Sequence, residues 1–341
     1  MIEDILDKSE LNKDDIISLL QVEGRNDVLL LYQKADEVRK QYCGDEVHLR
    51  GIIEFSNYCE QDCLYCGLRK SNSSLMRYRM RKDEILKTAE TIYQNGIRTI
   101  VLQSGEDFDF TGEEVEDIIT TIKSELNIAI TLSLGERSFG EYKIWRNAGA
   151  DRYLLKHETA NPKLYSIYHS DQKLQDRLDH LLYLKSLGYQ IGSGNLVGMP
   201  RQSITDIADD IILCKELDVD MASFSPFIPS PDTPYRKQSA CDINSILKVM
   251  AVGRIVLKNV HIPATTALGT IDEYGREKGL QVGANVIMPN YTPTPYRERY
   301  AIYPNKKCVN DNPQLCSSCL GLMIDSLGRK IGSGQGHSLK H

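Results

Sequence analysis

The alternation of apolar runs with amphipathic stretches constrains the fold of this 341-residue chain more than any other feature. From His48 onwards, eight short apolar runs alternate with segments whose apolar residues recur at helical spacing. The runs are LRGIIEFS, IRTIVLQSG, IAITLSLG, DRYLLKHE, YQIGSGNLVGM, DMASFSPFI, IPATTALGTI and GANVIMPN. Such alternation implies parallel strands joined by crossovers. Eight units predict an α/β fold, a closed (β/α)8 TIM barrel, with an open doubly wound sheet as the alternative.

The barrel is expected to span residues 48–300, with additions at both ends. Residues 1–47 predict an N-terminal helical extension, two helices separated near Glu23-Gly24. Residues 301–331 predict a C-terminal extension that carries a second Cys motif. The polar segment 332–341 predicts a disordered tail.

Two kinds of local signal mark helix ends inside the barrel region. Ser203-x-x-Asp206 stands before an apolar helical pattern and predicts a capping-box start. Gly96 and Gly188 follow helical patterns, where a left-handed residue commonly ends a helix.

Composition and charge exclude several classes of function. The net charge of -6 does not suggest a nucleic-acid binder, which usually shows a basic patch. No apolar run approaches the roughly 18 residues that span a membrane. The start MIEDILDKSE lacks the basic and apolar regions of a signal peptide. We therefore expect a cytoplasmic enzyme, in which nine cysteines favour metal or redox chemistry over disulfides.

Three cysteines within eight residues form the strongest chemical motif, Cys59-x3-Cys63-x2-Cys66. A 4Fe-4S cluster has four irons, usually with one Cys ligand each, so three thiolates leave one iron open for a chelating ligand. A structural zinc site needs four nitrogen or sulfur ligands, and this loop supplies three with no nearby His. Disulfides and unligated core thiols are further alternatives. The spacing favours the iron–sulfur cluster.

The expected carboxyl ends of the strands are polar and rich in glycine. Ser104-Gly105-Glu106, Gly192 to Gly198 and Lys156-His157-Glu158 stand at the ends of apolar runs. Active sites of such barrels gather at these ends, which here suit a zwitterionic, adenine-bearing ligand. His157 and Glu158 are adjacent on a predicted strand and face opposite ways, so we interpret His157 as structural.

The Cys motif, with Tyr65 directly before its last cysteine, resembles the signature of the radical S-adenosylmethionine superfamily. The resemblance implies a 4Fe-4S cluster, S-adenosylmethionine on its open iron and a 5′-deoxyadenosyl radical as the reactive species. It therefore implies no catalytic side chain. Ser104-Gly105-Glu106 matches the Gly-Gly-Glu motif of the superfamily in part.

Longer stretches resemble the HydE family of FeFe-hydrogenase maturases. They include FSNYCEQDCLYCGLRK, RYLLKHETANP, PFIPSPDTP, IPATTALGTI and YTPTPYR. The resemblance implies a small iron carbonyl-cyanide-cysteine substrate made by a partner maturase, on the way to the di-iron subcluster of the H-cluster. Expected partners are the other hydrogenase maturases and a reductant such as ferredoxin or flavodoxin, but neither nucleic acid nor membrane.

The same resemblance implies site residues by position. The cofactor would be bound by Tyr65, Gln103, Ser104, Gly105, Thr131, Ser133, Glu158, Arg177, Leu196, Ile228 and Met288. The substrate cavity would be lined by Arg152, Lys156, Met221, Thr265, Thr266 and Tyr303. The family commonly has Arg where Lys156 stands, and Lys keeps the charge but loses the bidentate fork.

A second set, Cys308-x7-Cys316-x2-Cys319, follows the last expected strand. We favour a second iron–sulfur cluster there, with a three-Cys zinc site or reduced thiols as alternatives. Rival functions are a radical S-adenosylmethionine enzyme of the methylornithine synthase or biotin synthase type and a two-cluster electron carrier. An electron carrier needs neither a barrel of this size nor an open iron.

Overall fold

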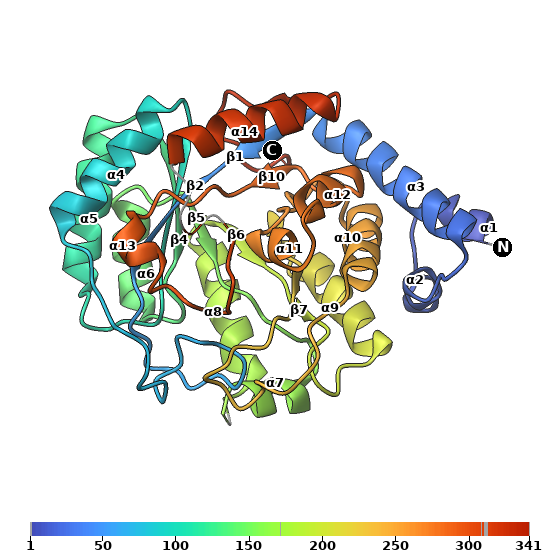
Figure 1. Ribbon diagram of the computed structural model, residues 1–341, viewed down its shortest axis with the longest axis horizontal. Coiled ribbons are helices and arrows are strands. Elements are labelled where there is room, and N and C mark those ends of the chain that lie inside the picture. Colours follow the sequence, from blue (N-terminus) through green and yellow to red (C-terminus); the bar gives the residue numbers. More distant parts are fainter. Residues whose placement is uncertain (1, 171, 308, 310–312, 341) are drawn as a thin grey trace.

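Six parallel strands form the continuous part of the barrel wall in the computed structural model, which describes residues 2–170, 172–307, 309 and 313–340 (Figure 1). Each strand pairs with the next in chain order. In order they are β2 (Gly51–Ser56), β3 (Thr99–Ser104), β4 (Ala129–Ser133), β5 (Arg152–Leu154), β6 (Gln190–Ser193) and β8 (Met221–Ala222). Their side chains are largely buried because helices cover one face and the barrel core fills the other.

Isolated parallel bridges close the ring between β8 and β2. They are Met221 with His261, Pro263 with Val286 and Ile52 with Asn290, and Val286 belongs to β10 (Val286–Ile287). The predicted (β/α)8 barrel is therefore confirmed. The seventh apolar run, however, is not a full strand: beyond Ala264 it turns into α11 (Thr266–Ile271). Thr265 is extended at the start of this helix, and TALGTI then continues as helix.

The crossover helices lie around the wall and follow the amphipathic stretches. They are α4 (Lys82–Gln94), α5 (Gly112–Glu125), α6 (Phe139–Asn147), α8 (Leu174–Ser186), α9 (Ile204–Glu216) and α10 (Ile243–Leu257). The capping box of α9 is present as predicted, with Ser203 and Asp206 exchanging hydrogen bonds. Gly96 and Gly188 have φ angles of 80° and 82°, the left-handed conformation expected after a helix.

The N-terminal extension consists of α1 (Ile2–Leu6), α2 (Lys13–Leu20) and α3 (Arg25–Cys43). The predicted break near Glu23-Gly24 is confirmed, since Gly24 is the N-cap of α3. The number of helices was wrong, because the described part of the extension holds the short α1 in addition to the two predicted helices. Helix α3 packs against α10, while α2 contacts both α9 and α10. The extension therefore lies on one side of the barrel, and its N-terminal end points away from the barrel (Figure 1).

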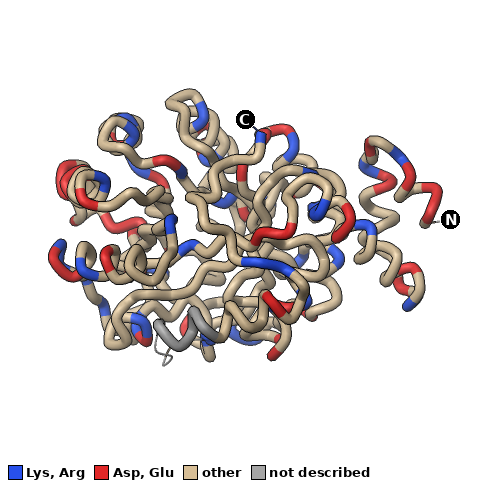
Figure 2. Tube along the Cα trace, turned by 90° about the horizontal axis from the view of Figure 1, so that it is seen from above, with Lys and Arg blue, Asp and Glu red and all other residues tan. Residues whose placement is uncertain are grey.

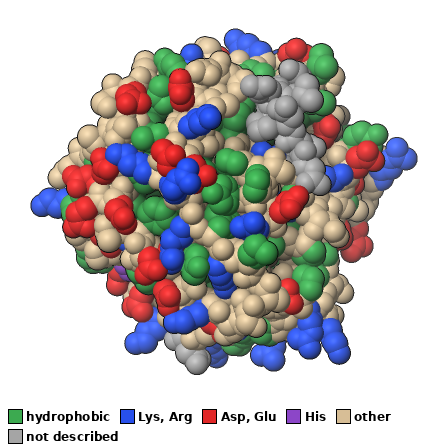
Figure 3. Space-filling view, turned by 60° about the vertical axis from the view of Figure 1, so that its left-hand side comes forward, with side chains coloured by type: hydrophobic (Ala, Val, Ile, Leu, Met, Phe, Trp, Pro, Cys, Tyr) green, Lys and Arg blue, Asp and Glu red, His purple; other side chains and the backbone are tan. Residues whose placement is uncertain are grey.

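Shorter elements complete the described chain. They are β1 (Glu46–Leu49), α7 (Pro162–Tyr168), β7 (Leu196–Val197), β9 (Ser225–Pro226), α12 (Gly275–Gln281), α13 (Thr294–Arg297), α14 (Pro313–Ser326) and β11 (Lys330–Ile331). Acidic and basic residues interleave along the trace and on the face shown in space-filling view (Figures 2 and 3). Within the described ranges, none of the helices has the length and apolar character that a membrane span needs.

The C-terminal segment 332–340 lies against the barrel, so the prediction of a disordered tail is wrong for these residues. The Gln335 carbonyl oxygen accepts a hydrogen bond from Arg152 Nη2 at 2.7 Å, and the Gly336 carbonyl accepts from Arg50 Nη2 at 3.2 Å. Ser338 Oγ donates to Asp220 at 2.5 Å. All three partners stand at or just before the first residue of a strand. The segment thus covers the amino-terminal end of the barrel.

Candidate functional site

The loop after β2 carries Cys59, Cys63 and Cys66 and has no regular structure, yet other parts of the chain fix its backbone. Leu64 N donates to Tyr168 O, the last residue of α7, and Gly67 N donates to Ile302 O, both at 2.9 Å. Asn57 Nδ2 donates to Arg299 O at 2.8 Å. The loop is therefore held from two sides of the barrel mouth, as a rigid cofactor loop must be.

The three thiols suit a bound iron–sulfur cluster. Cys63 and Cys66 line the large cavity, while Cys59 Sγ accepts from Glu106 N at 3.4 Å. Burial, followed by the nearby Cys59, raises the pKa of Cys66 to about 12, and burial followed by its two Cys neighbours raises that of Cys63. Buried, mutually repelling thiolates are stabilised by a cationic metal group.

The three thiols are compatible with the cluster that their motif predicts. Among the residues that the structure describes, no three His, Cys, Asp or Glu side chains converge on one ion. A 4Fe-4S cluster instead gives each cysteine its own iron, so its ligands need not converge on one point.

Gly105, at the end of β3, lets this strand end pack directly against the Cys loop. Its N–H donates to Ser56 O at 3.2 Å. A Cβ at this position would lie 2.1 Å from Tyr58 O and 2.7 Å from the Cβ of Cys59. Any other residue would therefore push the Cys loop away. This is a physical reason for the Gly in the Ser104-Gly105-Glu106 motif.

Glu106, the acid of that motif, braces neighbouring loops. One of its carboxylate oxygens accepts from Glu136 N at 3.0 Å, and Gln61 Nε2 donates to the other. Burial raises the pKa of Glu106, while Arg177 acts in the opposite direction.

A cavity of about 360 Å³ opens at the carboxyl ends of the strands. Of the predicted cofactor residues it is lined by Tyr65, Gln103, Ser104, Ser133, Glu158, Arg177, Leu196, Ile228 and Met288. Of the predicted substrate residues it is lined by Lys156, Thr265, Thr266 and Tyr303. Four polar lining residues were not predicted: Glu54, Ser223, Ser225 and Lys306.

Arg177 on α8 reaches this cavity and is anchored by two bonds. Its Nε donates to Glu136 at 2.6 Å and its Nη1 to the Lys156 carbonyl at 3.1 Å. Burial opposes its charge, yet Tyr165 and Glu136 together raise the pKa of Arg177 above the usual arginine range. A fixed guanidinium on the cavity wall can pair with a carboxylate of a bound ligand.

Glu158 is held in a left-handed backbone conformation, with φ of 61°. Backbone bonds impose it: Glu158 N donates to Gly194 O at 2.9 Å, and Leu196 N donates to Glu158 O at 3.2 Å. The Glu158 carboxylate lies 3.0 Å from Lys156 Nζ. Such strain costs of order 1–3 kcal/mol and is typical of functional sites.

His157 beside it is fully buried, and its backbone N and Nδ1 both contact Ser193 Oγ. Burial lowers the pKa of His157 to about 3, so the ring stays neutral. These contacts support the interpretation of His157 as a structural residue. Its premise was wrong, because β5 ends at Leu154 and Glu158 adopts a left-handed rather than a strand conformation.

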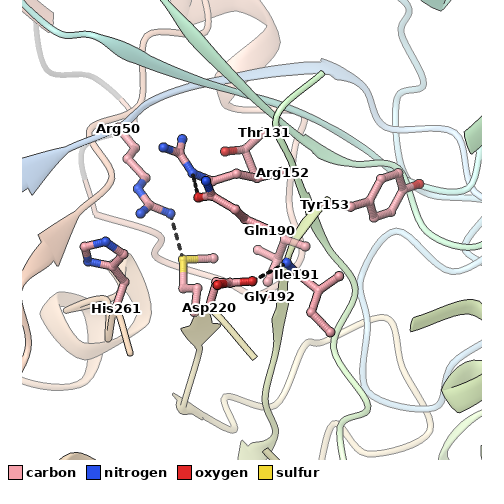
Figure 4. Close-up of a pocket in the computed structure, with 11 residues that line it drawn as sticks. Arg50, Thr131, Arg152, Tyr153, Gln190, Ile191, Gly192, Asp220 and His261 are labelled. Carbon is pink, nitrogen blue, oxygen red and sulfur yellow. Dashed lines mark hydrogen bonds between the residues drawn. The ribbon is translucent and has the colours of Figure 1, made fainter. Parts of the chain in front are cut away.

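Three predicted site residues lie elsewhere. Thr131, Arg152 and Met221 line a smaller pocket toward the amino-terminal ends of the strands, together with Arg50 and His261 (Figure 4). Arg50 Nη1 lies 3.1 Å from Met221 Sδ, and Arg152 Nε donates to Gln190 at 3.0 Å. Arg152 precedes Lys156 by four residues, a distance of about 13 Å along an extended chain. Arg152 therefore lies deeper in the barrel than Lys156, below the large cavity.

The C-terminal cysteines are described in part. Cys308 and the side chain of Cys316 lie outside the described residues. Cys319, on α14, is an exposed free thiol.

Comparison with known proteins gives this site a family. The model of the radical SAM superfamily matches residues 53–214. The FeFe-hydrogenase maturase subunit HydE of Thermotoga maritima is 48% identical over 331 residues, 97% of this chain and 95% of that protein. The 3-methylornithine synthase of Methanosarcina acetivorans is 30% identical over 288 residues, 84% of this chain and 81% of that protein.

Two solved structures share the fold. The crystal structure of methylornithine synthase (PylB) superposes with a TM-score of 0.86 at 24% identity and covers 97% of each chain. That of HydG, a maturase of the FeFe-hydrogenase, gives 0.76 at 20% identity, covering 89% of this chain and 70% of HydG.

The barrel, the Cys loop and the family match define a radical S-adenosylmethionine enzyme. Within that superfamily, the chain belongs to the HydE family of FeFe-hydrogenase maturases.

Proposed function

We infer that the protein is an S-adenosylmethionine-dependent iron–sulfur enzyme that acts as an FeFe-hydrogenase maturase in assembly of the di-iron subcluster of the H-cluster. The family supports this, since HydE of T. maritima shares 48% of the aligned residues. One observation carries the chemistry: Cys63 and Cys66 line the same cavity as Arg177 and Glu158. The predicted cluster ligands and cofactor-binding groups thus line one cavity.

In this proposal Cys59, Cys63 and Cys66 hold a 4Fe-4S cluster. When bound, the cluster supplies the electron that cleaves S-adenosylmethionine to a 5′-deoxyadenosyl radical. Arg177 pairs with the methionine carboxylate through charge-assisted hydrogen bonds. Glu158 accepts a hydrogen bond from a ribose hydroxyl.

The substrate of this proposal is a small iron carbonyl-cyanide-cysteine species supplied by a partner maturase. Lys156, Thr265 and Thr266 would hold it, and the buried Thr265 hydroxyl has no partner among the described residues. A ferredoxin or flavodoxin would reduce the cluster. The cytoplasm, a reducing compartment, suits the free thiols of the described cysteines.

The experiment begins with protein whose cluster has been reconstituted without oxygen. S-adenosylmethionine should change the EPR signal of the reduced cluster, because it binds the open iron. Adding the iron species should accelerate 5′-deoxyadenosine release and yield a product that supports hydrogenase activation. Incubation with lysine tests the methylornithine synthase alternative. Methylornithine formation, without turnover of the iron species, would refute the maturase proposal.

We further propose that Cys308, Cys316 and Cys319 bind a second metal centre that radical generation does not need. This proposal is supported by the position of the three cysteines in the sequence, where they follow the last barrel strand. A triple Cys→Ser variant should contain less iron and still release 5′-deoxyadenosine. Loss of both in a folded variant would contradict this proposal.

A further inference from the structure

A loop from Tyr300 to Lys307 connects the Cys loop with the cavity wall. Its Ile302 carbonyl accepts from Gly67 N, the residue after Cys66, at 2.9 Å. The contact is tight, since a Cβ on Gly67 would lie 2.0 Å from the neighbouring carbonyl of Ala301. Further along, Tyr303 and Lys306 line the cavity. The position of the Lys306 side chain is therefore tied to the loop that carries the cluster ligands.

Lys306 forms a buried ion pair with Glu54 of β2. The Lys306 side chain is 7% exposed and that of Glu54 is 3% exposed. Lys306 Nζ donates to one Glu54 oxygen, and Asn290 Nδ2 donates to the other at 2.8 Å. Nζ also lies 5.0 Å from the centre of the Tyr300 ring. Asn290 thus fixes the Glu54 carboxylate, and that carboxylate holds the Lys306 ammonium group at one position on the cavity wall.

Such a pair is a poor device for stability alone. Removing two charges from water costs several kcal/mol per ion, and apolar pairs of similar volume often stabilise a fold as well or better. An ammonium group fixed on a cavity wall has three donors, so it can offer the remaining ones to an anionic ligand. Its location therefore favours a binding role.

The charges that line the cavity indicate the sign of this ligand. They are the cationic Lys156, Arg177 and Lys306 and the anionic Glu54 and Glu158. Arg177 and Glu158 are assigned above to the cofactor. Lys156 is already paired with Glu158, but the lining as a whole carries three cationic and two anionic groups and so favours an anion.

The two ammonium groups stand on different sides of the barrel. Lys156 follows β5, whereas Lys306 contacts β2, three strand positions away in the sheet. At about 4.8 Å per strand, the backbones of β2 and β5 stand about 14 Å apart along the wall. Both lysine side chains line the same cavity, so an anionic complex bound there can contact both.

We propose that Lys306 is a substrate-binding residue, held in position by Glu54, that contacts an anionic group of the iron species. The inference rests on the proposed function and extends it to a residue outside the set implied by family resemblance. An ammonium group on a flexible stem presents a point charge with three rotatable donors, which suits a ligand whose anionic groups are not planar.

The test compares Lys306→Met with Lys306→Arg, and uses Lys307→Met as the matched control. Lys307 is the exposed neighbour in the same loop. Each variant is reconstituted with its cluster, and the KM for the synthetic iron carbonyl-cyanide-cysteine complex is measured from 5′-deoxyadenosine release. The Kd for S-adenosylmethionine is measured by calorimetry. Lys306→Met should raise the KM about tenfold or more, the worth of a charge-assisted hydrogen bond. Lys306→Arg, which keeps the charge but not the compact ammonium group, should raise the KM less than Lys306→Met. Lys307→Met should remain close to the wild type, and no variant should change the Kd of the cofactor.

A double variant, Glu54→Gln with Lys306→Met, separates binding from bracing of the loop. The double variant removes both charges, so no buried carboxylate is left without its partner. It replaces Lys306→Met in the test if that single variant does not fold. The inference requires that its KM stay high. Glu54→Gln alone should raise the KM less than Lys306→Met, because it loosens the ammonium group but leaves its charge in place. A wild-type KM in the double variant, or weaker cofactor binding in place of substrate binding, would overturn it. If the wild-type enzyme itself does not turn over the iron complex, the proposed function fails, and this inference with it.

Discussion

Asp210 on α9 offers a sharp physical test, because a fully buried carboxylate here holds the turn that carries Glu158. Its Oδ1 accepts from Ala160 N and its Oδ2 from Asn195 Nδ2, both at 2.5 Å. Burial raises the pKa of Asp210 to about 7, although these two hydrogen bonds act in the opposite direction. The folded protein therefore favours the protonated acid.

The sign and size of the effect follow from linkage. Asp210 has a pKa of about 7 when folded and an ordinary value of 3.8. Between these values the folded state binds more protons than the unfolded state, so the free energy of unfolding falls as pH rises. Each pKa unit is worth about 1.4 kcal/mol, which gives a loss of about 4 kcal/mol between pH 4 and pH 8. Asp210→Asn removes the titrating group and abolishes this loss.

The substitution should leave the turn intact. An Asn at 210 keeps the oxygen that accepts from Ala160 N. Its amide group then needs an acceptor, and the buried Asn195 Oδ1, which has no hydrogen-bond partner among the described residues, becomes one when the Asn195 amide rotates. Asp210→Ala, in contrast, would leave two buried donors unpaired, at about 1–3 kcal/mol each.

The assay is urea denaturation of the cluster-loaded protein without oxygen, followed by circular dichroism at pH 5.5 and pH 8. Asp210→Asn should gain stability over the wild type mainly at pH 8. The matched control is Asp209→Asn, whose side chain is 40% exposed and pairs with Lys13. It should show no such change with pH. An equal difference between Asp210→Asn and the wild type at both pH values would refute the assignment of a protonated buried acid.

Three further predictions concern the cofactor site. Replacing Cys59, Cys63 and Cys66 together with Ala should abolish S-adenosylmethionine cleavage, and wild-type rates of 5′-deoxyadenosine release would contradict the cluster assignment. Arg177→Ala should weaken S-adenosylmethionine binding by more than about tenfold in calorimetric titration while the cluster remains, since losing a buried charged partner costs about 2–5 kcal/mol. Gly105→Ala should lower cluster content and cleavage together, because its Cβ would meet Tyr58 O at 2.1 Å; unchanged iron content would refute this reason for the glycine.

The barrel and the ring of strand ends could be predicted because their signals are local. Apolar runs, helical spacing and turn residues are each read within a few residues, and parallel order follows from their alternation. The cavity is then lined by residues that follow these runs, such as Ser104, Glu158 and Met288. Family resemblance placed both Arg152 and Lys156 at the substrate cavity, but only Lys156 lines it, and Arg152 lines the smaller pocket instead.

Features that depend on partners distant in the sequence could not be predicted. The segment 332–340 has the composition of a disordered tail, but two buried guanidinium groups, those of Arg50 and Arg152, donate to its carbonyl oxygens. Buried Arg side chains need acceptors, and the tail supplies them. Nothing within the tail itself reveals that those donors exist.

Glu54 carried a signal that pattern analysis could have used. It stands inside GIIEFS, a run in which every residue is buried. An acid at such a position is rarely buried without a partner. In a parallel barrel, where helices cover the outer face, an inward acid implies a cation that reaches the interior from elsewhere. The cation is Lys306, 252 residues away in the chain. A charged residue within an apolar strand therefore indicates a cavity and a missing partner, but the identity of that partner emerges only when the chain is folded.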